Sequence, residues 1–186
     1  MRKNLSAKEF AKVSLEKIKN GSIIREPYTK SDIDKDKEIY DMLARRKFEN
    51  AERKILQYLE AKPYDTFLRN FLTYIQIKTK KFDIAEELIK GTKLLEPKNL
   101  KCRTYELYIK FLLGQEEEVI KKRKEIDEIL QTPQSPNVPN HMLYGIEINF
   151  LKAFDEVLEK KKNRESNLEE DLDIMYWIFE ISMVYF

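Results

Sequence analysis

The chain has 186 residues, of which 42% are apolar and 37% are charged, and its formal net charge is +2. This composition excludes a disordered chain, and the length is sufficient for one domain or one short repeat array with a core of its own. The low number of glycines and the many Glu, Lys, Leu and Ile residues favour long helices over strands.

The two ends of the sequence differ in charge, and neither carries a membrane signal. Residues 1–30 contain eight Lys and Arg against three acidic residues, whereas residues 165–186 contain six acidic residues and no Lys or Arg. This asymmetry either orients partners by long-range attraction or is random drift on a charge-rich surface. No apolar run has the form of a signal peptide or the length of a membrane span. We therefore expect a cytoplasmic protein, and a single cysteine, Cys102, fits a reducing compartment.

Residues 1–31 are predicted to form a helix and a connector. Ser6 and Glu9 make a capping-box pattern that starts a helix, and Gly21 marks its end. The proline-containing stretch 22–31 has no helical pattern and is expected to connect to the next helix. We expect the first helix to cap the apolar face of the first repeat, because the ends of a stacked array need covering.

Residues 32–131 carry an internal repeat of 34 residues. The pairs at this spacing are Phe48 and Phe82, Ala51 and Ala85, Glu52 and Glu86, and Pro63 and Pro97. A period of this length is typical of stacked helical repeats. Apolar spacing and helix breakers predict three hairpins, with first helices at about 32–45, 66–79 and 100–113 and second helices at about 48–62, 82–95 and 115–131.

Residues 132–186 depart from the repeat. Prolines interrupt the chain at 132–139, and two further helices are predicted over about 140–162 and 168–184. The last helix is apolar nearly all round, which indicates burial on more than one side. It either forms an interface with a second copy of the chain or another protein, or packs internally against the preceding helix. The candidate oligomer surface consists of Trp177, Ile178, Ile181, Tyr185 and Phe186.

The hairpins resemble the tetratricopeptide repeat family. In that pattern an aromatic residue opens the second helix, a small residue follows three positions later where the helices cross, and a proline comes twelve positions after that. The residues that fit are Phe48, Ala51 and Pro63, and again Phe82, Ala85 and Pro97. A small side chain is needed at the crossing because the two backbones approach closely there. The first helices depart from the pattern, since the family's small residue is replaced by Ile39, Thr73 and Leu107.

The resemblance implies an all-α fold: a right-handed helix-turn-helix repeat array, or solenoid, with an N-terminal capping helix and two C-terminal helices. It also implies a concave groove, lined by the first helices, that binds a peptide or a partner helix. The tyrosines among the candidate lining residues recur every 34 residues, and they belong either to this groove or to the core. The candidate lining residues are Asp36, Tyr40, Asn70, Tyr74, Thr104 and Tyr108.

Basic residues cluster in equivalent turns of the first two hairpins. Stacking would align them along one edge, which could follow a phosphate backbone in a salt-sensitive way. Exposed lysines in turns more often form an ordinary solvated face. The residues of this basic edge are Arg45, Arg46, Lys47, Lys78, Lys80 and Lys81.

The sequence offers little for catalysis. One histidine, His141, and one cysteine do not make a zinc site, which takes about four ligands. Cys102 falls on a helix far from His141 in sequence, and no glycine-rich phosphate loop is present. We therefore expect no enzyme activity, no metal and no cofactor.

The sequence thus predicts a non-enzymatic protein-interaction module, either an adaptor or chaperone-like, that could also self-associate through its last helix. The alternatives are a nucleic-acid-associated helical scaffold that uses the basic edge, and a subunit that works only inside a larger complex. No membrane association is expected.

Overall fold

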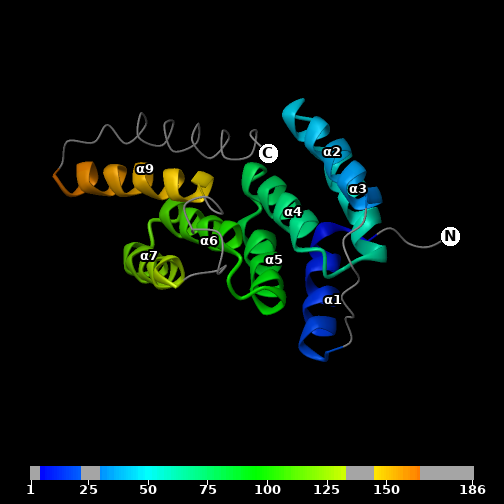
Figure 1. Ribbon diagram of the computed structural model, residues 1–186, viewed down its shortest axis with the longest axis horizontal. Helices are drawn as coiled ribbons and strands as arrows, with labels where there is room; N and C mark the ends of the chain where they lie inside the picture. Colours follow the sequence, from blue (N-terminus) through cyan, green and yellow to red (C-terminus); the bar gives the residue numbers. More distant parts are fainter. Residues whose placement is uncertain (1–4, 22–29, 133–144, 164–186) are drawn as a thin grey trace. The chain divides into compact units, whose positions relative to one another are not determined.

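The computed structural model describes residues 5–21, 30–132 and 145–163, and all secondary structure within these ranges is helical (Figure 1). The prediction of an all-α protein is confirmed for this part of the chain. The predicted connector after Gly21, the proline-rich break and the last helix lie outside the described residues. The helices are α1 (Ala7–Lys19), α2 (Lys30–Ala44), α3 (Phe48–Ala61), α4 (Thr66–Lys78), α5 (Phe82–Leu95), α6 (Leu100–Leu112), α7 (Glu116–Gln131) and α9 (Gly145–Lys162).

The chain forms two compact units, Met1–Lys124 and Glu125–Phe186, and the boundary between them falls inside α7. The first unit contains α1 to α6 and the beginning of α7. In the second unit α9 buries Phe150, Leu151 and Phe154 on one side, as the 3.6-residue helical period requires.

The 34-residue period recurs in the backbone as well as in the sequence. The turns after α2, α4 and α6 each place one residue at positive φ: Arg46 at 56°, Lys80 at 57° and Gly114 at 67°. In each turn the following N–H bonds back to the helix carbonyl five residues earlier, as in Lys47 to Met42, Lys81 to Gln76 and Gln115 to Lys110. This six-to-one bond is the Schellman ending of a helix. The three first helices therefore end in the same way, although glycine supplies the left-handed conformation only once.

The small residues predicted at the helix crossings are buried. Ala51 and Ala85 are fully buried, and Val119, which lies 34 residues after Ala85, is buried as well. Phe48, which opens α3, sets its ring edge-on against Tyr74 of α4 with 6.3 Å between ring centroids. Successive helices from α2 to α6 contact their neighbours, and α4 also contacts α6, the first helix of the next hairpin. α4 is the central element, because every residue from Leu68 to Ile77 is buried.

Two expectations for the start of the chain need correction. The Ser6–Glu9 capping box is present, with the Ser6 N–H donating to Glu9 Oε2 at 2.9 Å. However, α1 packs mainly against α5 and touches α3 only slightly, so it covers the second hairpin rather than capping the first. A polar contact explains this placement: Ser14 of α1 accepts a hydrogen bond from Arg69 of α4, beside α5. In addition α2 begins at Lys30, so residues 30 and 31, predicted to be part of the connector, belong to the helix.

Candidate functional site

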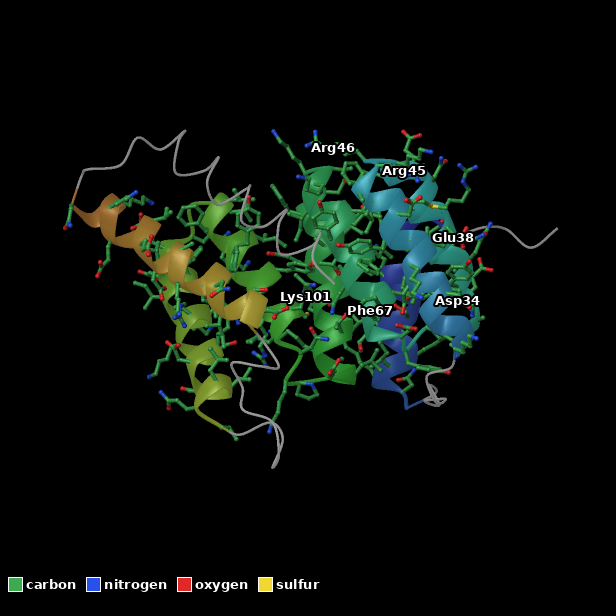
Figure 2. All side chains as sticks on the ribbon, turned by 45° about the horizontal axis from the view of Figure 1, so that its top comes forward. Asp34, Glu38, Arg45, Arg46, Phe67 and Lys101 are labelled. Carbon is green, nitrogen blue, oxygen red and sulfur yellow. The ribbon has the colours of Figure 1, made fainter. Side chains whose placement is uncertain are left out.

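The six residues predicted to line a groove lie on α2, α4 and α6, two on each helix. Five of them are buried, with exposed fractions from 3% for Tyr108 to 8% for Asp36, and Tyr40 is half-buried. Figure 2 labels three neighbouring positions, Asp34, Phe67 and Lys101, which come from these same three helices. The sequence left open whether these positions belong to a groove or to the core, and their burial is compatible with a core role.

Three of the six residues nevertheless carry buried polar atoms that lack a hydrogen bond within the described part of the chain. These atoms are Oδ2 of Asp36, the hydroxyl oxygen of Tyr40 and Oδ1 of Asn70. Both amide atoms of the Gln76 side chain, six residues further along α4, also lack a hydrogen bond. Buried polar groups are nearly always hydrogen-bonded, and leaving one unpaired costs about 1–3 kcal/mol. Several unpaired polar atoms are unusual in a core that has no further role.

The side chains that cap the N-termini of α4 and α6 are also 34 residues apart. Asp65 caps α4 by accepting hydrogen bonds from the N–H groups of Phe67 and Leu68, both at 3.0 Å. Asn99, which is 34 residues later, caps α6 by accepting from the N–H of Cys102 at 2.8 Å. Asn70 of the preceding first helix donates from Nδ2 to Oδ1 of Asn99 at 3.3 Å. Asp36 and Asp65 hold the corresponding positions 34 residues earlier, so the first hairpin has two carboxyl groups where the second has two amides.

This arrangement changes the acidity of Asp36. Burial, and to a lesser extent the charge of Asp65, raise the pKa of its carboxyl from 3.8 to about 7. Near neutral pH the group therefore exists in both protonation states. It can accept hydrogen bonds or a cation when ionised and can donate one hydrogen bond when protonated.

Sequence reasoning missed Asp65 and Asn99, although the signal was present. Each lies two residues after a proline and directly before an apolar helix, which is where Asp and Asn are favoured as N-caps. The pattern Pro-x-Asp or Pro-x-Asn at 63–65 and 97–99 could have identified both.

A second feature missed from the sequence is the buried guanidinium of Arg69. Arg69 donates to Ser14 Oγ and to the Pro63 carbonyl at 3.1 Å, and to Thr92 Oγ1 at 3.2 Å. Its charge also lies 5.4 Å from the centre of the Phe10 ring. Burial lowers the pKa of Arg69 to about 10, so the group stays charged at neutral pH. It joins α1, α4 and α5 through neutral acceptors. Gly91 leaves space for the Arg69 guanidinium, since a Cβ at residue 91 would collide with it. A glycine in the middle of a predicted helix was the sequence feature that could have indicated this close contact.

The predicted basic edge is exposed apart from Lys78, which is half-buried and lies 5.9 Å from the centre of the Tyr74 ring. Arg45 and Arg46 are labelled at the end of α2 in Figure 2, and Arg45 pairs with Asp41 at 2.9 Å. Most of these cations follow the last turn of α2 or α4, where the helix dipole favours positive charge. The helix dipole is therefore sufficient to account for basic residues in these two turns, at Arg45, Arg46 and Lys47 and at Lys78, Lys80 and Lys81.

The remaining candidates offer little chemistry. Cys102 is buried, its pKa is raised to about 12 chiefly by that burial, and its thiol lies 3.6 Å from the Ile89 carbonyl. His141 and the oligomer residues Trp177, Ile178, Ile181, Tyr185 and Phe186 lie outside the described residues. Among the described residues, no three His, Cys, Asp or Glu side chains are grouped so that they could hold a metal ion.

A surface hollow of about 370 Å³ lies along α3 and shares no residue with the predicted groove. It is bordered by Glu49, Glu52 and Glu60, and by Lys81 at the start of α5. Within the described ranges, no helix combines the length and the apolar character that crossing a membrane requires.

Compared with known proteins, the chain matches no family model, no curated protein and no solved structure.

Proposed function

We propose that the chain is a protein-interaction module, built as a tetratricopeptide-like array whose first helices α2, α4 and α6 bind an extended segment of another polypeptide. The observation that carries this proposal is the set of unpaired, buried polar atoms on Asp36, Tyr40 and Asn70. An extended peptide has free N–H and C=O groups along its length, and it can satisfy such atoms when it binds.

The spacing of these atoms supports the same proposal. Asp36 and Asn70 stand one 34-residue period apart, and Tyr40 follows Asp36 by one helical turn on the same face. Polar groups that repeat with the hairpins suit a ligand that runs across the first helices. Buried tyrosines at equivalent positions, Tyr74 and Tyr108, would supply apolar contact area at a low cost in side-chain entropy.

The burial of these residues bears on how binding would occur. A peptide could reach the unpaired atoms only if neighbouring side chains or segments move aside, and complexes with such ordering steps are common in regulatory interactions. We therefore expect association slower than the usual 10⁵–10⁷ M⁻¹s⁻¹.

The test compares two tyrosine variants that differ only in whether the hydroxyl group is paired. Tyr40→Phe removes an unpaired hydroxyl, and Tyr58→Phe removes one that donates to Glu38 at 2.6 Å. Peptides are selected on the full chain from a random 12-residue display library, and their affinities are measured by fluorescence polarisation. We expect Tyr40→Phe combined with Asn70→Ala to weaken binding at least tenfold, and Tyr58→Phe to leave it within twofold.

Two outcomes would contradict the proposal. One is a set of selected peptides whose affinity is unaffected by the combined variant, since the site would then lie elsewhere. The other is a failure to select any peptide while a generic oligonucleotide is retained in a salt-sensitive way. In the second case Lys80→Glu with Lys81→Glu should abolish retention, and the nucleic-acid-associated scaffold would replace the present proposal.

A further inference from the structure

The surface hollow along α3 is a groove with an apolar floor. Most of its lining residues lie on one stripe of α3 that runs from Glu49 to Glu60, which corresponds to about 16 Å of helix. The least exposed of them is Leu56, at 9%, and the half-buried Leu5 just before α1 adds a second apolar side chain. The hollow therefore offers apolar contact area over about three helical turns.

The internal repeat shows what packs on this face of a second helix. Gln57, which lines the hollow, stands 34 residues before Gly91 of α5. Gly91 is buried, and a Cβ placed there would lie 3.4 Å from Cδ1 of Ile18 in α1. α1 packs along α5 but touches α3 only slightly, and Gln57 stays exposed (Figure 1). The face that carries a helix on α5 is thus open on α3.

The same comparison indicates the charge that a helix on α3 would carry. Glu86 of α5 pairs with Lys110 of α6 at 2.6 Å. The residues 34 positions earlier are Glu52 of α3 and Gln76 of α4, so a neutral amide replaces the lysine. Glu52 lines the hollow and has no hydrogen bond or ion pair within the described part of the chain, and both amide atoms of Gln76 are buried without a hydrogen bond. The Glu52 carboxylate is therefore available to a cation from outside.

The rest of the rim has the same character. Glu49 and Glu60 also form no hydrogen bond or ion pair among the described residues. Arg53 and Lys81 border the hollow as well, but Arg53 donates to Asn50 at 2.6 Å and neither cation pairs with these glutamates. Within the described ranges, no three carboxylates are grouped closely enough to hold a metal ion. An apolar floor with a mainly acidic rim suits an amphipathic segment that has basic residues beside its apolar ones.

We propose that the hollow binds a basic amphipathic helix of another polypeptide. The helix lies on α3 as α1 lies on α5, with apolar side chains on Leu5 and Leu56. One of its lysine or arginine residues pairs with Glu52, as Lys110 does with Glu86. Because the hollow shares no residue with the predicted groove on the first helices, this docking surface is independent of the proposed function.

The test uses a 14-residue amphipathic helical peptide made of leucine and lysine, and a counterpart in which glutamate replaces every lysine. Fluorescence polarisation measures the binding of each peptide to the full chain. Glu52→Gln with Glu60→Gln removes two charges from the hollow, and Gln57→Trp fills the hollow while keeping every charge. The matched control is Glu156→Gln with Glu159→Gln, which removes the same charges from exposed positions on α9.

We expect the wild type and the α9 control to bind the leucine–lysine peptide at least tenfold more tightly than either hollow variant does. The glutamate counterpart should bind the wild type at least tenfold more weakly. Tyr40→Phe with Asn70→Ala should leave the affinity for the leucine–lysine peptide within twofold, which separates this result from the test of the proposed function. Thermal unfolding of each variant confirms that the fold is intact before affinities are compared.

Four outcomes would overturn the inference. The first is no binding of the leucine–lysine peptide to the wild type, and the second is equal binding of the glutamate counterpart. The third is an affinity that Gln57→Trp leaves unchanged, since charge alone would then attract the peptide. The fourth is a dimer in sedimentation that Gln57→Trp dissociates, because a second copy of the chain would then occupy the hollow.

Discussion

Replacing Gly91 by alanine tests whether the buried Arg69 holds the first unit together as the structure indicates. Gly91 lies inside α5, and an added Cβ would collide with Nη2 of Arg69 and come within 3.2 Å of its Cζ. In an ordinary helix interior, Gly→Ala stabilises a protein by about 1 kcal/mol. Here the gain is offset, because the guanidinium has to leave its place between α1, α4 and α5.

The size of the effect follows from the contacts that Arg69 makes. The guanidinium donates to Ser14, Pro63 and Thr92 at 3.1–3.2 Å, and it packs on the Phe10 ring. Hydrogen bonds from a charged donor contribute about 1.5–3 kcal/mol each, and breaking the contacts of a buried charge costs about 3–5 kcal/mol. After subtracting the gain in helix propensity, we expect Gly91→Ala to lower the free energy of unfolding by about 2–4 kcal/mol.

The decisive measurement is a double-mutant cycle with Arg69→Met, followed by urea unfolding and circular dichroism at 222 nm. Methionine fills similar space without charge, and Ser14 and Thr92 keep their own bonds to the Ala11 and Leu88 carbonyls. In that background Gly91→Ala should become stabilising by about 1 kcal/mol, so the sign of the effect reverses. A stabilising effect of Gly91→Ala in the wild type would show that the guanidinium does not occupy this space.

Three further outcomes are expected from urea unfolding. Lys80→Gly should stabilise the chain by about 1 kcal/mol, because Lys80 has a φ of 57°, a conformation that favours glycine. Gly114→Ala should destabilise the chain by a similar amount for the same reason. If both substitutions changed stability in the same direction, the two turns would not share this conformation. Ala85→Leu should destabilise by about 1–3 kcal/mol through overpacking at the helix crossing, unless the crossing is looser than its complete burial indicates. Asp36→Asn should have no effect near pH 4 and should stabilise increasingly up to about pH 8. A folded-state pKa raised from 3.8 to about 7 means that the wild type loses stability as pH rises through that interval, by at most about 4 kcal/mol, and a pH-independent difference would contradict this assignment.

The helices and their period could be predicted from the sequence because they depend on local features. Ser6 and Glu9 cap α1 as expected, and Gly114 ends α6 through a left-handed residue. Arg46 and Lys80 adopt the same backbone conformation without being glycine, so residue type did not reveal those two turns. The repeat still indicates where these turns lie, because Ala51, Ala85 and Val119 each stand in the first turn of a second helix.

The placement of α1 could not be predicted, because it depends on contacts between residues distant in the sequence. Ser14 and Arg69 are 55 residues apart, and neither is apolar, so a search for apolar faces passes over both. Arg69 in the middle of an amphipathic pattern looks like a solvent-exposed residue, yet it is fully buried. Only the combination of Arg69 with Gly91 and Thr92 on α5 makes such burial possible, and no rule of local spacing joins these three positions.

A repeat protein also contains its own reference for identifying a site. The backbone of the first two hairpins is the same at the turns, so side-chain chemistry at equivalent positions can be compared directly. Asn70 with Asn99 shows that an amide pair satisfies the geometry, because the two side chains hydrogen-bond and the helix remains capped. Asp65 caps its helix equally well, and each pair leaves one acceptor unpaired, Oδ2 of Asp36 and Oδ1 of Asn70. Protonation therefore distinguishes the two hairpins. Near neutral pH the Asp36 carboxyl, whose pKa burial raises to about 7, changes between hydrogen-bond donor and acceptor, whereas the amide of Asn70 always has both groups.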